Sequence, residues 1–387
     1  MSFYYRLSAV LIAATIASLQ PEFAVAQLSA QQVEEIDRNQ CTPSGEIDFN
    51  EAIRLNPNDA EAYNGRGTVR YDQGDREGAI ADYNEAIRLN PSYAEAYYNR
   101  ALARSDQGDI EGEIADYNEA IRVNPSYAEA YNNRALARYD QGDIQGAIAD
   151  LNEVIRLEPN DAGAYYKRAF LRSQQGDKPG AIADYNEAIR LEPNYAEAYS
   201  DRGVVRYDRG DMQGAIADYN EAIRLDPSYA AAYINRGVVR YDQGDKPGAI
   251  ADYNEAIRLD PSYANAYYNR GIVRDEQGDK QGALADFNEA IRLEPSYAEV
   301  YSKRGIVHYY QGNIQGALAD YNEAIRLDPN DADSYYNRAL VRKEQRDIQG
   351  AINDLQKASE LYQQQRNTDS YRDAQNAIRE LQKELEV

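Results

Sequence analysis

The chain has 387 residues, of which 43% are hydrophobic, and it carries a formal net charge of −23. This acidic excess argues against binding to nucleic-acid phosphates or anionic lipids and favours cationic partners, while regularly recurring apolar residues argue against a disordered acidic chain. A single cysteine, Cys41, and a single histidine, His308, exclude an intramolecular disulfide and a Cys/His metal site within one chain. We predict neither a metal ion nor a cofactor.

Residues 1–26 have the pattern of a secretory signal peptide. Arg6 precedes an apolar run over residues 7–19, and residues 24–26 read Ala-Val-Ala, the form of a cleavage site. The run is too short to span a bilayer comfortably, although an uncleaved anchor is the alternative. We therefore predict cleavage after Ala26 and export of a soluble mature chain to the periplasm or another extracytoplasmic compartment, without membrane insertion.

The rest of the chain is dominated by prolines that recur at one fixed spacing. Nine of them lie 34 residues apart: Pro57, Pro91, Pro125, Pro159, Pro193, Pro227, Pro261, Pro295 and Pro329. Composition bias does not produce such a spacing, which instead indicates a repeated structural unit. We place nine units over residues 60–365. Residues 27–59 precede them as an N-terminal segment with a degenerate half repeat, in which residues 45–55 match a second helix.

Each unit reads as an antiparallel pair of helices. In the unit at residues 60–93, numbered here as positions 1 to 34, apolar residues with helical spacing predict helices over 60–73 and 76–89. Gly74 between them suits a left-handed helix C-cap, and Asp75 suits the N-cap of the second helix. Proline at position 32 then prevents the second helix from continuing.

Small and large residues alternate at fixed positions of the unit. Position 4 is tyrosine in every unit, position 8 is glycine or alanine, position 20 is alanine in eight units, and position 24 is Tyr, Phe or Leu. With alanine at position 27 and proline at position 32, this pattern resembles the tetratricopeptide repeat, in a form similar to one common in bacterial, exported repeat proteins. The resemblance implies an all-α fold, a right-handed superhelical solenoid of antiparallel helix pairs with a concave groove.

Two positions depart from the family pattern in every unit, with arginine at position 7 and aspartate at position 23. Both face the helix interface in the consensus unit, where a half-buried arginine needs a carboxylate or carbonyl partner. We therefore predict structural ion pairs between the two positions; a solvated stripe of arginines is the alternative. The representative predicted pairs are Arg100 with Asp116, Arg168 with Asp184 and Arg236 with Asp252. Position 11 is arginine in eight units, and the sequence does not assign its partner.

Glu113 breaks the pattern at position 20, where the other eight units have alanine. A carboxylate at this tight helix crossing should either loosen the second unit or reach a nearby arginine. A chance substitution and a functional feature are both consistent with the sequence.

Residues 366–387 follow the last unit and include an amphipathic stretch at 369–385. A helix with one apolar and one charged face is typical of the cap that ends a repeat array. The rival interpretation is a coiled-coil dimerisation helix, which the stretch is barely long enough to form. We predict a cap and a monomeric protein.

In the resembled family, ligands lie along a groove lined by positions 2, 5, 6, 9, 12 and 13. Asparagine amides can hold a peptide backbone, and tyrosine combines apolar area with a polar tip. The partner-groove residues carried over by position are Glu95, Tyr98, Asn99, Glu129, Asn133, Tyr139, Asp140, Tyr207, Asn235, Tyr241, Asp242, Tyr268, Asn269, Tyr309 and Asn337. The acidic residues favour an extended, basic or neutral protein segment whose affinity falls with salt. The alternative is that these charges only keep an exposed helix face soluble.

These features together predict a non-catalytic protein–protein interaction scaffold. An enzyme is not predicted, because nearly every carboxylate follows its repeat position and no nucleophile motif or glycine-rich phosphate loop occurs. A self-assembling structural repeat protein is the alternative function.

Overall fold

The computed structural model describes residues 48–385. The predicted signal peptide, the stretch 27–47 and Cys41 lie outside the described residues. All regular secondary structure in the described part is α-helical, as the sequence predicted. The chain divides into two compact units, one ending at Asp201 and the other beginning at Arg202.

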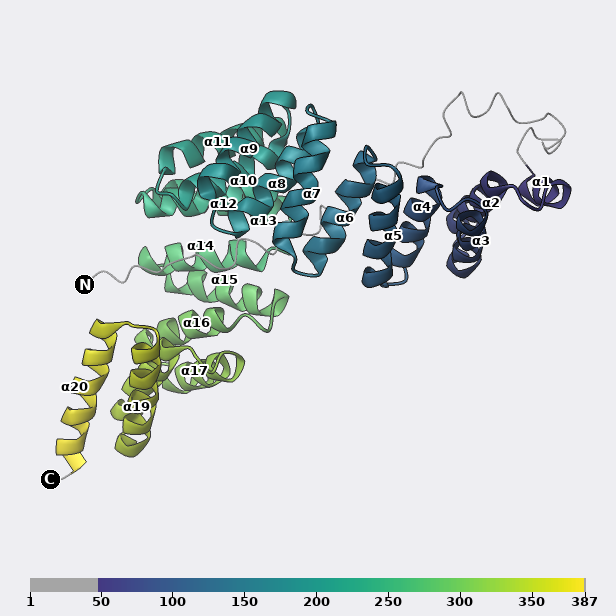
Figure 1. Ribbon diagram of the computed structural model, residues 1–387. Helices are drawn as coiled ribbons and strands as arrows, with labels where there is room; N and C mark the ends of the chain where they lie inside the picture. Colours follow the sequence, from purple (N-terminus) through teal and green to yellow (C-terminus); the bar gives the residue numbers. More distant parts are fainter. Residues whose placement is uncertain (1–47, 386–387) are drawn as a thin grey trace. The chain divides into compact units, whose positions relative to one another are not determined.

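The first compact unit contains a half repeat followed by four helix pairs (Figure 1). Its helices are α1 (Phe49–Leu55), α2 (Ala60–Asp72), α3 (Arg76–Leu89), α4 (Ala94–Ser105), α5 (Ile110–Val123), α6 (Ala128–Asp140), α7 (Ile144–Leu157), α8 (Ala162–Gln174), α9 (Lys178–Leu191) and the start of α10 (Ala196–Tyr207). In each pair the first helix carries positions 1 to about 13 and the second helix begins at position 17.

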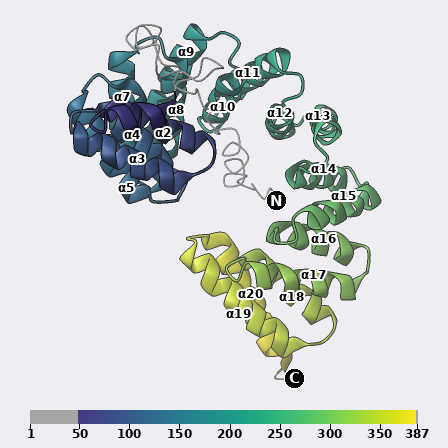
Figure 2. The same ribbon diagram turned by 90° about the vertical axis from the view of Figure 1, so that its right-hand side faces the viewer.

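The second compact unit continues the same alternation and ends with one additional helix. Its helices are the rest of α10, α11 (Met212–Leu225), α12 (Ala230–Asp242), α13 (Lys246–Leu259), α14 (Ala264–Glu276), α15 (Lys280–Leu293), α16 (Ala298–Tyr310), α17 (Ile314–Leu327), α18 (Ala332–Glu344), α19 (Ile348–Gln364) and α20 (Thr368–Leu385). In both views the pairs from α14 onward follow one another in chain order, each beside the next (Figure 2). Consecutive first helices, such as α14 and α16, also touch each other directly.

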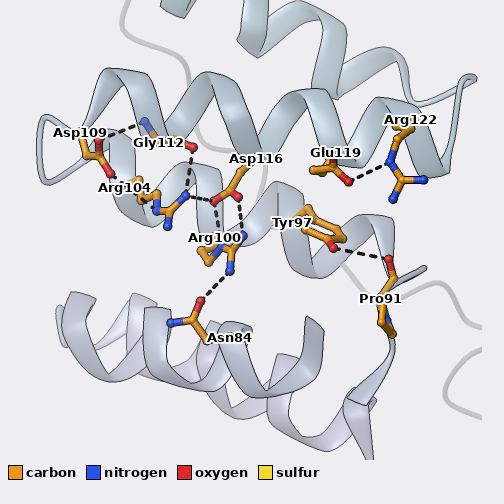
Figure 3. Close-up of polar contacts among 10 residues, drawn as sticks. All are labelled: Asn84, Pro91, Tyr97, Arg100, Arg104, Asp109, Gly112, Asp116, Glu119 and Arg122. Atoms are coloured by element: carbon orange, nitrogen blue, oxygen red, sulfur yellow. Dashed lines mark hydrogen bonds and ion pairs between the residues drawn. The ribbon is translucent and has the colours of Figure 1, made fainter. Parts of the chain in front are cut away.

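The turn inside each helix pair depends on a glycine and an aspartate. In the first eight repeats the glycine at position 15 has a positive φ, which is 74° at Gly108, and this left-handed conformation is costly for other residues. Asp109 follows as the N-cap of α5, and its carboxylate accepts a hydrogen bond of 3.0 Å from the backbone N–H of Gly112 (Figure 3). These contacts satisfy helix ends that would otherwise leave donors unpaired.

The core of each pair consists of small residues packed against one aromatic ring. The alanines at positions 20 and 27 are fully buried in most repeats, as are Ala249 and Ala256 around Tyr253, which is 1% exposed. Gly237 at position 8 lies under this ring, so that a Cβ added there would lie 2.6 Å from Tyr253 Cε1. Close approach of the two helices therefore requires a small residue at position 8.

Substitution at Gly237 should show a graded cost. We expect Gly237→Val to lower the free energy of unfolding by about 1–3 kcal/mol, because a branched side chain forces the ring of Tyr253 away. Gly237→Ala should cost less, since Ala101 and Ala169 already occupy this position opposite tyrosines in other repeats. Urea denaturation followed by circular dichroism measures both changes, and equal costs for valine and alanine would contradict the packing argument.

Helix α20 covers the apolar face of α19 at the end of the array. Ala374, Ile378 and Leu381 are buried in a common cluster with α19. Gln375 also donates a hydrogen bond of 2.7 Å to Ser359, at the position where the first eight repeats have isoleucine. The last pair therefore ends in a mixed apolar and polar contact specific to α20.

Candidate functional site

A buried aspartate at position 23 joins the two helices of each pair. In the second repeat, Arg100 of α4 donates from Nε and Nη2 to the two carboxylate oxygens of Asp116 in α5, over 2.9 and 2.5 Å (Figure 3). Asp116 is 2% exposed and Arg100 is half-buried. Bidentate arginine–carboxylate pairs of this kind combine charge with fixed geometry. The arginine at position 7 and the aspartate at position 23 are paired in all nine repeats.

The same aspartate also binds the arginine at position 11, for which the sequence assigned no partner. Arg104 donates from Nη1 to Asp116 over 2.8 Å and to the carbonyl oxygen of Gly112 over 3.1 Å (Figure 3). In the eighth repeat His308 replaces this arginine, and its Nδ1 lies 2.9 Å from Asp320. In the other eight repeats, two arginines of the same repeat thus compensate the buried carboxylate.

The position-7 arginine also reaches the preceding repeat. Arg100 Nη1 donates to Oδ1 of Asn84, at position 25 of the first repeat, over 2.6 Å (Figure 3). Equivalent bonds are made by Arg66, Arg134, Arg168, Arg236, Arg270, Arg304 and Arg338. Sequence reasoning missed this role of the asparagine, although its presence at position 25 of every repeat but the ninth was a usable signal. One side chain therefore links the helices of a pair and also links neighbouring repeats.

The tyrosine at position 4 covers the position-7 arginine. The guanidinium carbon of Arg100 lies 5.5 Å from the ring centroid of Tyr97, within the range of a cation–π contact. The Tyr97 hydroxyl donates to the carbonyl oxygen of Pro91 over 3.4 Å (Figure 3). All of these contacts are made to other residues of the same chain. The arginines at position 7 therefore stabilise the packing of each repeat and of neighbouring repeats.

The groove positions 2, 5, 6, 9, 12 and 13 lie on the first helix of each pair and are called here the first-helix face. Several asparagines expected to present free amides on this face do not do so, because Asn99, Asn235 and Asn269 are only 7–8% exposed. Asn99 donates its amide to Asn64 Oδ1 of the preceding repeat over 3.0 Å. The expectation of an open row of amides is therefore wrong for these three residues, which bury most of their surface against neighbouring helices.

The two other predicted asparagines, Asn133 and Asn337, are half-buried. Asn133 donates to the hydroxyl of Tyr98 over 3.0 Å. In the same register, the hydroxyl of Tyr166 at position 5 donates to Asp201 at position 6 of the next repeat, over 2.8 Å. Positions 5 and 6 therefore form polar contacts between repeats, a use that only the packing of consecutive first helices reveals.

The tyrosines at position 5 belong to aromatic clusters. Tyr98 is half-buried, with its ring centroid 5.8 Å from that of Tyr117 and 5.0 Å from that of Tyr127. Burial raises the pKa of Tyr98. Tyr268 is 1% exposed and donates its hydroxyl to Glu299. The expectation that Tyr268 lines an accessible groove is therefore wrong, because its ring is enclosed by packing.

The acidic residues at position 2 differ in environment. Glu129 is exposed, whereas Glu95 is half-buried. Burial, and then the nearby charge of Glu61, raise the pKa of Glu95 above its ordinary value. These two predicted groove acids therefore remain at least partly accessible to a cationic ligand.

Positions 12 and 13 form a more open edge of the first-helix face. The tyrosines Tyr139, Tyr207, Tyr241 and Tyr309 are half-buried, while Asp140 and Asp242 are exposed. In the second compact unit the hydroxyl of Tyr207 donates to Asp242, and that of Tyr241 donates to Glu276 over 2.6 Å. A tyrosine at position 12 thus contacts an acid at position 13 of the next repeat, and the exposed carboxylates keep the rest of their surface free for solvent or a ligand.

Glu113 is buried at the α4–α5 crossing, where it is 7% exposed. Ser105 lies near this carboxylate at position 12, where five repeats have the larger tyrosine, and its hydroxyl acts to lower the pKa of Glu113. Burial raises the pKa of Glu113 to about 7, and the nearby charges of Asp140 and Asp106 act in the same direction. The expected contact with an arginine is not formed, since no cationic nitrogen among residues 48–385 lies within 4.0 Å of this carboxylate.

The described residues contain neither a membrane-spanning helix nor a cluster of metal ligands. No helix within residues 48–385 is both long and apolar enough to cross a membrane. Within the same residues, no group of three or more His, Cys, Asp or Glu side chains is arranged to hold a metal ion.

Comparison with solved structures identifies the fold. A tetratricopeptide repeat protein from Parabacteroides merdae ATCC 43184 is 19% identical, with a TM-score of 0.53 over 64% of this chain and 98% of that one. Cut9–Hcn1 of the APC/C hetero-tetramer is 15% identical, with a TM-score of 0.52 over 84% and 81%. Pseudomonas aeruginosa pilF is 20% identical, with a TM-score of 0.50 over 57% and 99%. At these identities the likeness concerns the fold alone.

No curated protein matches the chain. The family comparison, in contrast, covers most of it. The family model described as TPR repeat matches eight overlapping segments between residues 67 and 346. A second family model, described as Tetratricopeptide repeat, matches residues 332–365. Helix pairs at the same 34-residue period occupy these segments. The chain therefore belongs to the tetratricopeptide repeat family.

Proposed function

We propose that the protein is a non-catalytic scaffold that binds an extended, basic or neutral protein segment on the first-helix face. Tetratricopeptide repeats are in general protein-interaction modules. The observation that carries the proposal is the repeated edge of half-buried tyrosines at position 12 and exposed acids at position 13, displayed by consecutive first helices. Tyrosine offers apolar area with a polar tip, and the acids favour a cationic partner.

Export is part of this proposal. The signal-peptide pattern of residues 1–26 directs the chain to an extracytoplasmic compartment, where the array would act as a monomer. Helix α20 argues against the alternative of end-to-end self-assembly, because it covers the face of α19 that a further repeat would use. Sedimentation velocity of the mature chain should therefore give a single species whose size does not grow with concentration.

A site-specific photo-crosslinker tests which surface meets the partner. With p-benzoylphenylalanine in place of Tyr139 on α6, irradiation of the exported fraction should yield a covalent adduct with a partner that mass spectrometry can name. The matched control places the same group at Arg190, an exposed residue of the second helix α9. Adducts from position 190 alone would overturn the proposal. Adduct yield from position 139 should also fall between 50 and about 300 mM salt, because exposed charges are screened.

A further inference from the structure

The first repeat shows how the position 12–13 edge holds a cation. Arg76 at position 17 places its guanidinium carbon 4.0 Å from the ring centroid of Tyr71 at position 12. Its Nε donates over 2.6 Å to Asp106, the acid at position 13 of the next repeat. Tyr71 lies near the same carboxylate, and burial together with the charge of Asp106 raises the pKa of the tyrosine. A tyrosine and an acid from consecutive first helices thus bind one arginine of the chain itself.

The same arrangement recurs with lysine in the second compact unit. Glu276 accepts a hydrogen bond of 2.6 Å from the hydroxyl of Tyr241. Lys246, again at position 17, lies with Nζ 3.1 Å from the other carboxylate oxygen of Glu276. Two tyrosine–acid pairs of this chain are therefore occupied by a cation from position 17.

Two further pairs have a tyrosine and an acid at the same positions but receive no cation from the described part of the chain. The hydroxyl of Tyr207 donates to Asp242. Tyr309 lies near Glu344, and burial together with this carboxylate raises the pKa of the tyrosine. The residue at position 17 is Met212 beside the first of these pairs and Ile314 beside the second, and both are apolar. Within residues 48–385, no Lys, Arg or His nitrogen lies within 4.0 Å of either carboxylate, and both acids are exposed.

The surroundings of the second pair extend its aromatic surface. Tyr310, at a position where most other repeats have an acid, is 73% exposed. Its ring centroid lies 5.5 Å from that of Tyr309 in an edge contact. Asn313 replaces the usual N-cap aspartate of the next helix. An exposed aromatic group thus extends the aromatic surface at Tyr309, and such groups are enriched where proteins bind partners.

We infer that Tyr207 with Asp242, and Tyr309 with Glu344, are binding sites for arginine side chains of the partner segment. This inference rests on the proposed function and names the chemistry that the partner brings to it. The guanidinium of the partner takes the place that Arg76 fills in the first repeat, paired with the carboxylate and lying against tyrosine. Arginine suits this arrangement better than lysine, because its planar group can stack and pair at once.

The test uses a fluorescein-labelled peptide of four Gly-Ser-Arg units and a second peptide with citrulline, the neutral isostere, in place of arginine. Fluorescence anisotropy at 50 mM NaCl should give an affinity for the arginine peptide about tenfold or more above that for the citrulline peptide. Met212→Arg and Ile314→Arg supply each site with its own cation, in imitation of Arg76. Each should weaken binding of the arginine peptide about threefold, and together about tenfold.

The matched control is Ile144→Arg, which adds the same charge at position 17 beside Tyr139. At this place the next repeat has the uncharged Gln174 at position 13 instead of an acid, so the tyrosine has no carboxylate opposite it. It should change the affinity less than about twofold. Arg76→Met should open a third site and strengthen binding. Circular dichroism melting confirms that each variant is folded.

Equal affinity for the two peptides, or a double variant that binds like Ile144→Arg, would overturn this inference. The crosslink from position 139 separates that failure from failure of the proposed function. One outcome is that the crosslink forms while Met212→Arg and Ile314→Arg leave the affinity for the arginine peptide unchanged. In that case the first-helix face still binds a partner, but not through these two sites.

Discussion

Replacing Asp184 by alanine should lower the free energy of unfolding by about 3–5 kcal/mol, because one buried carboxylate is removed from two arginines. Arg168 donates to Asp184 over 2.8 and 2.6 Å, and Arg172 donates to it over 2.8 Å. Asp184 itself is 4% exposed. The substitution leaves both guanidinium groups without their acceptor in the helix interface. Urea denaturation at pH 7, followed by circular dichroism, measures the loss.

The same helix provides a matched control. Glu187 of α9 pairs with Arg190 over 2.6 Å, but this pair lies at the surface, with Arg190 exposed and Glu187 half-buried. Glu187→Ala should therefore lower the free energy of unfolding far less than Asp184→Ala does, because an ion pair at the surface is screened by solvent. If Asp184→Ala unfolded at the same urea concentration as Glu187→Ala, the arginines would behave as a solvated stripe. A fall in the steepness of the transition would additionally show that the array had lost cooperativity across the fourth repeat.

The second large effect is expected at Glu113, where alanine should stabilise the protein. Alanine is the residue of the other eight repeats at this position, and it removes a buried carboxylate that has no cationic partner in the described chain. At pH 8 the gain should be on the order of 3 kcal/mol, since the pKa of Glu113 is raised from 4.5 to about 7 in the folded state and each unit of difference between the folded and unfolded states is worth about 1.4 kcal/mol. The measurement is the difference in unfolding free energy between variant and wild type.

The gain should depend on pH in a defined direction. The folded-state pKa of Glu113 is about 7, above the ordinary value of 4.5, so the folded protein holds this proton more tightly than the unfolded chain. The wild-type side chain is therefore best tolerated below about pH 4.5, and its stabilising protonation is lost between pH 4.5 and 7. The advantage of Glu113→Ala should grow over that interval and level off above it.

A reciprocal substitution provides the control for Glu113. Ala147→Glu places the same carboxylate in the next repeat, where Tyr139 rather than serine occupies position 12. Without the space and the hydroxyl that Ser105 offers, this variant should be less stable than wild type at pH 8. A Glu113→Ala protein that is less stable than wild type at pH 8 would show that the carboxylate has a favourable partner.

Much of the fold could be predicted because the residues that begin and end each helix act locally within the repeat. Glycine at position 15, aspartate at position 16 and proline at position 32 set where helices end and begin, and these signals act within a few residues. The contact of Arg100 with Asp116 could also be anticipated, since two opposite charges at helix-interface positions have few other partners. By contrast, the contacts of Arg104 and Asn84 depend on side-chain reach across helices, which no local pattern encodes.

The candidate site was less predictable for a related reason. Family positions predicted a binding face on the first helix of each pair, but they could not show which side chains are used in contacts between repeats. Asn99 and Tyr268 bury their polar groups against neighbouring side chains, whereas Asp242 stays exposed on the same face. Exposure at each position depends on the residue that the adjacent repeat places opposite it, and that residue varies from repeat to repeat.

The sequence by itself determined the all-α repeat architecture, the period of the helix pairs and the charge that favours a cationic partner. These follow from residue types whose effects are local or additive. Only the tertiary structure decided that one aspartate binds two arginines and that Tyr207 and Asp242 meet without a cation from residues 48–385. Both outcomes depend on distances between side chains of different helices, and packing sets those distances.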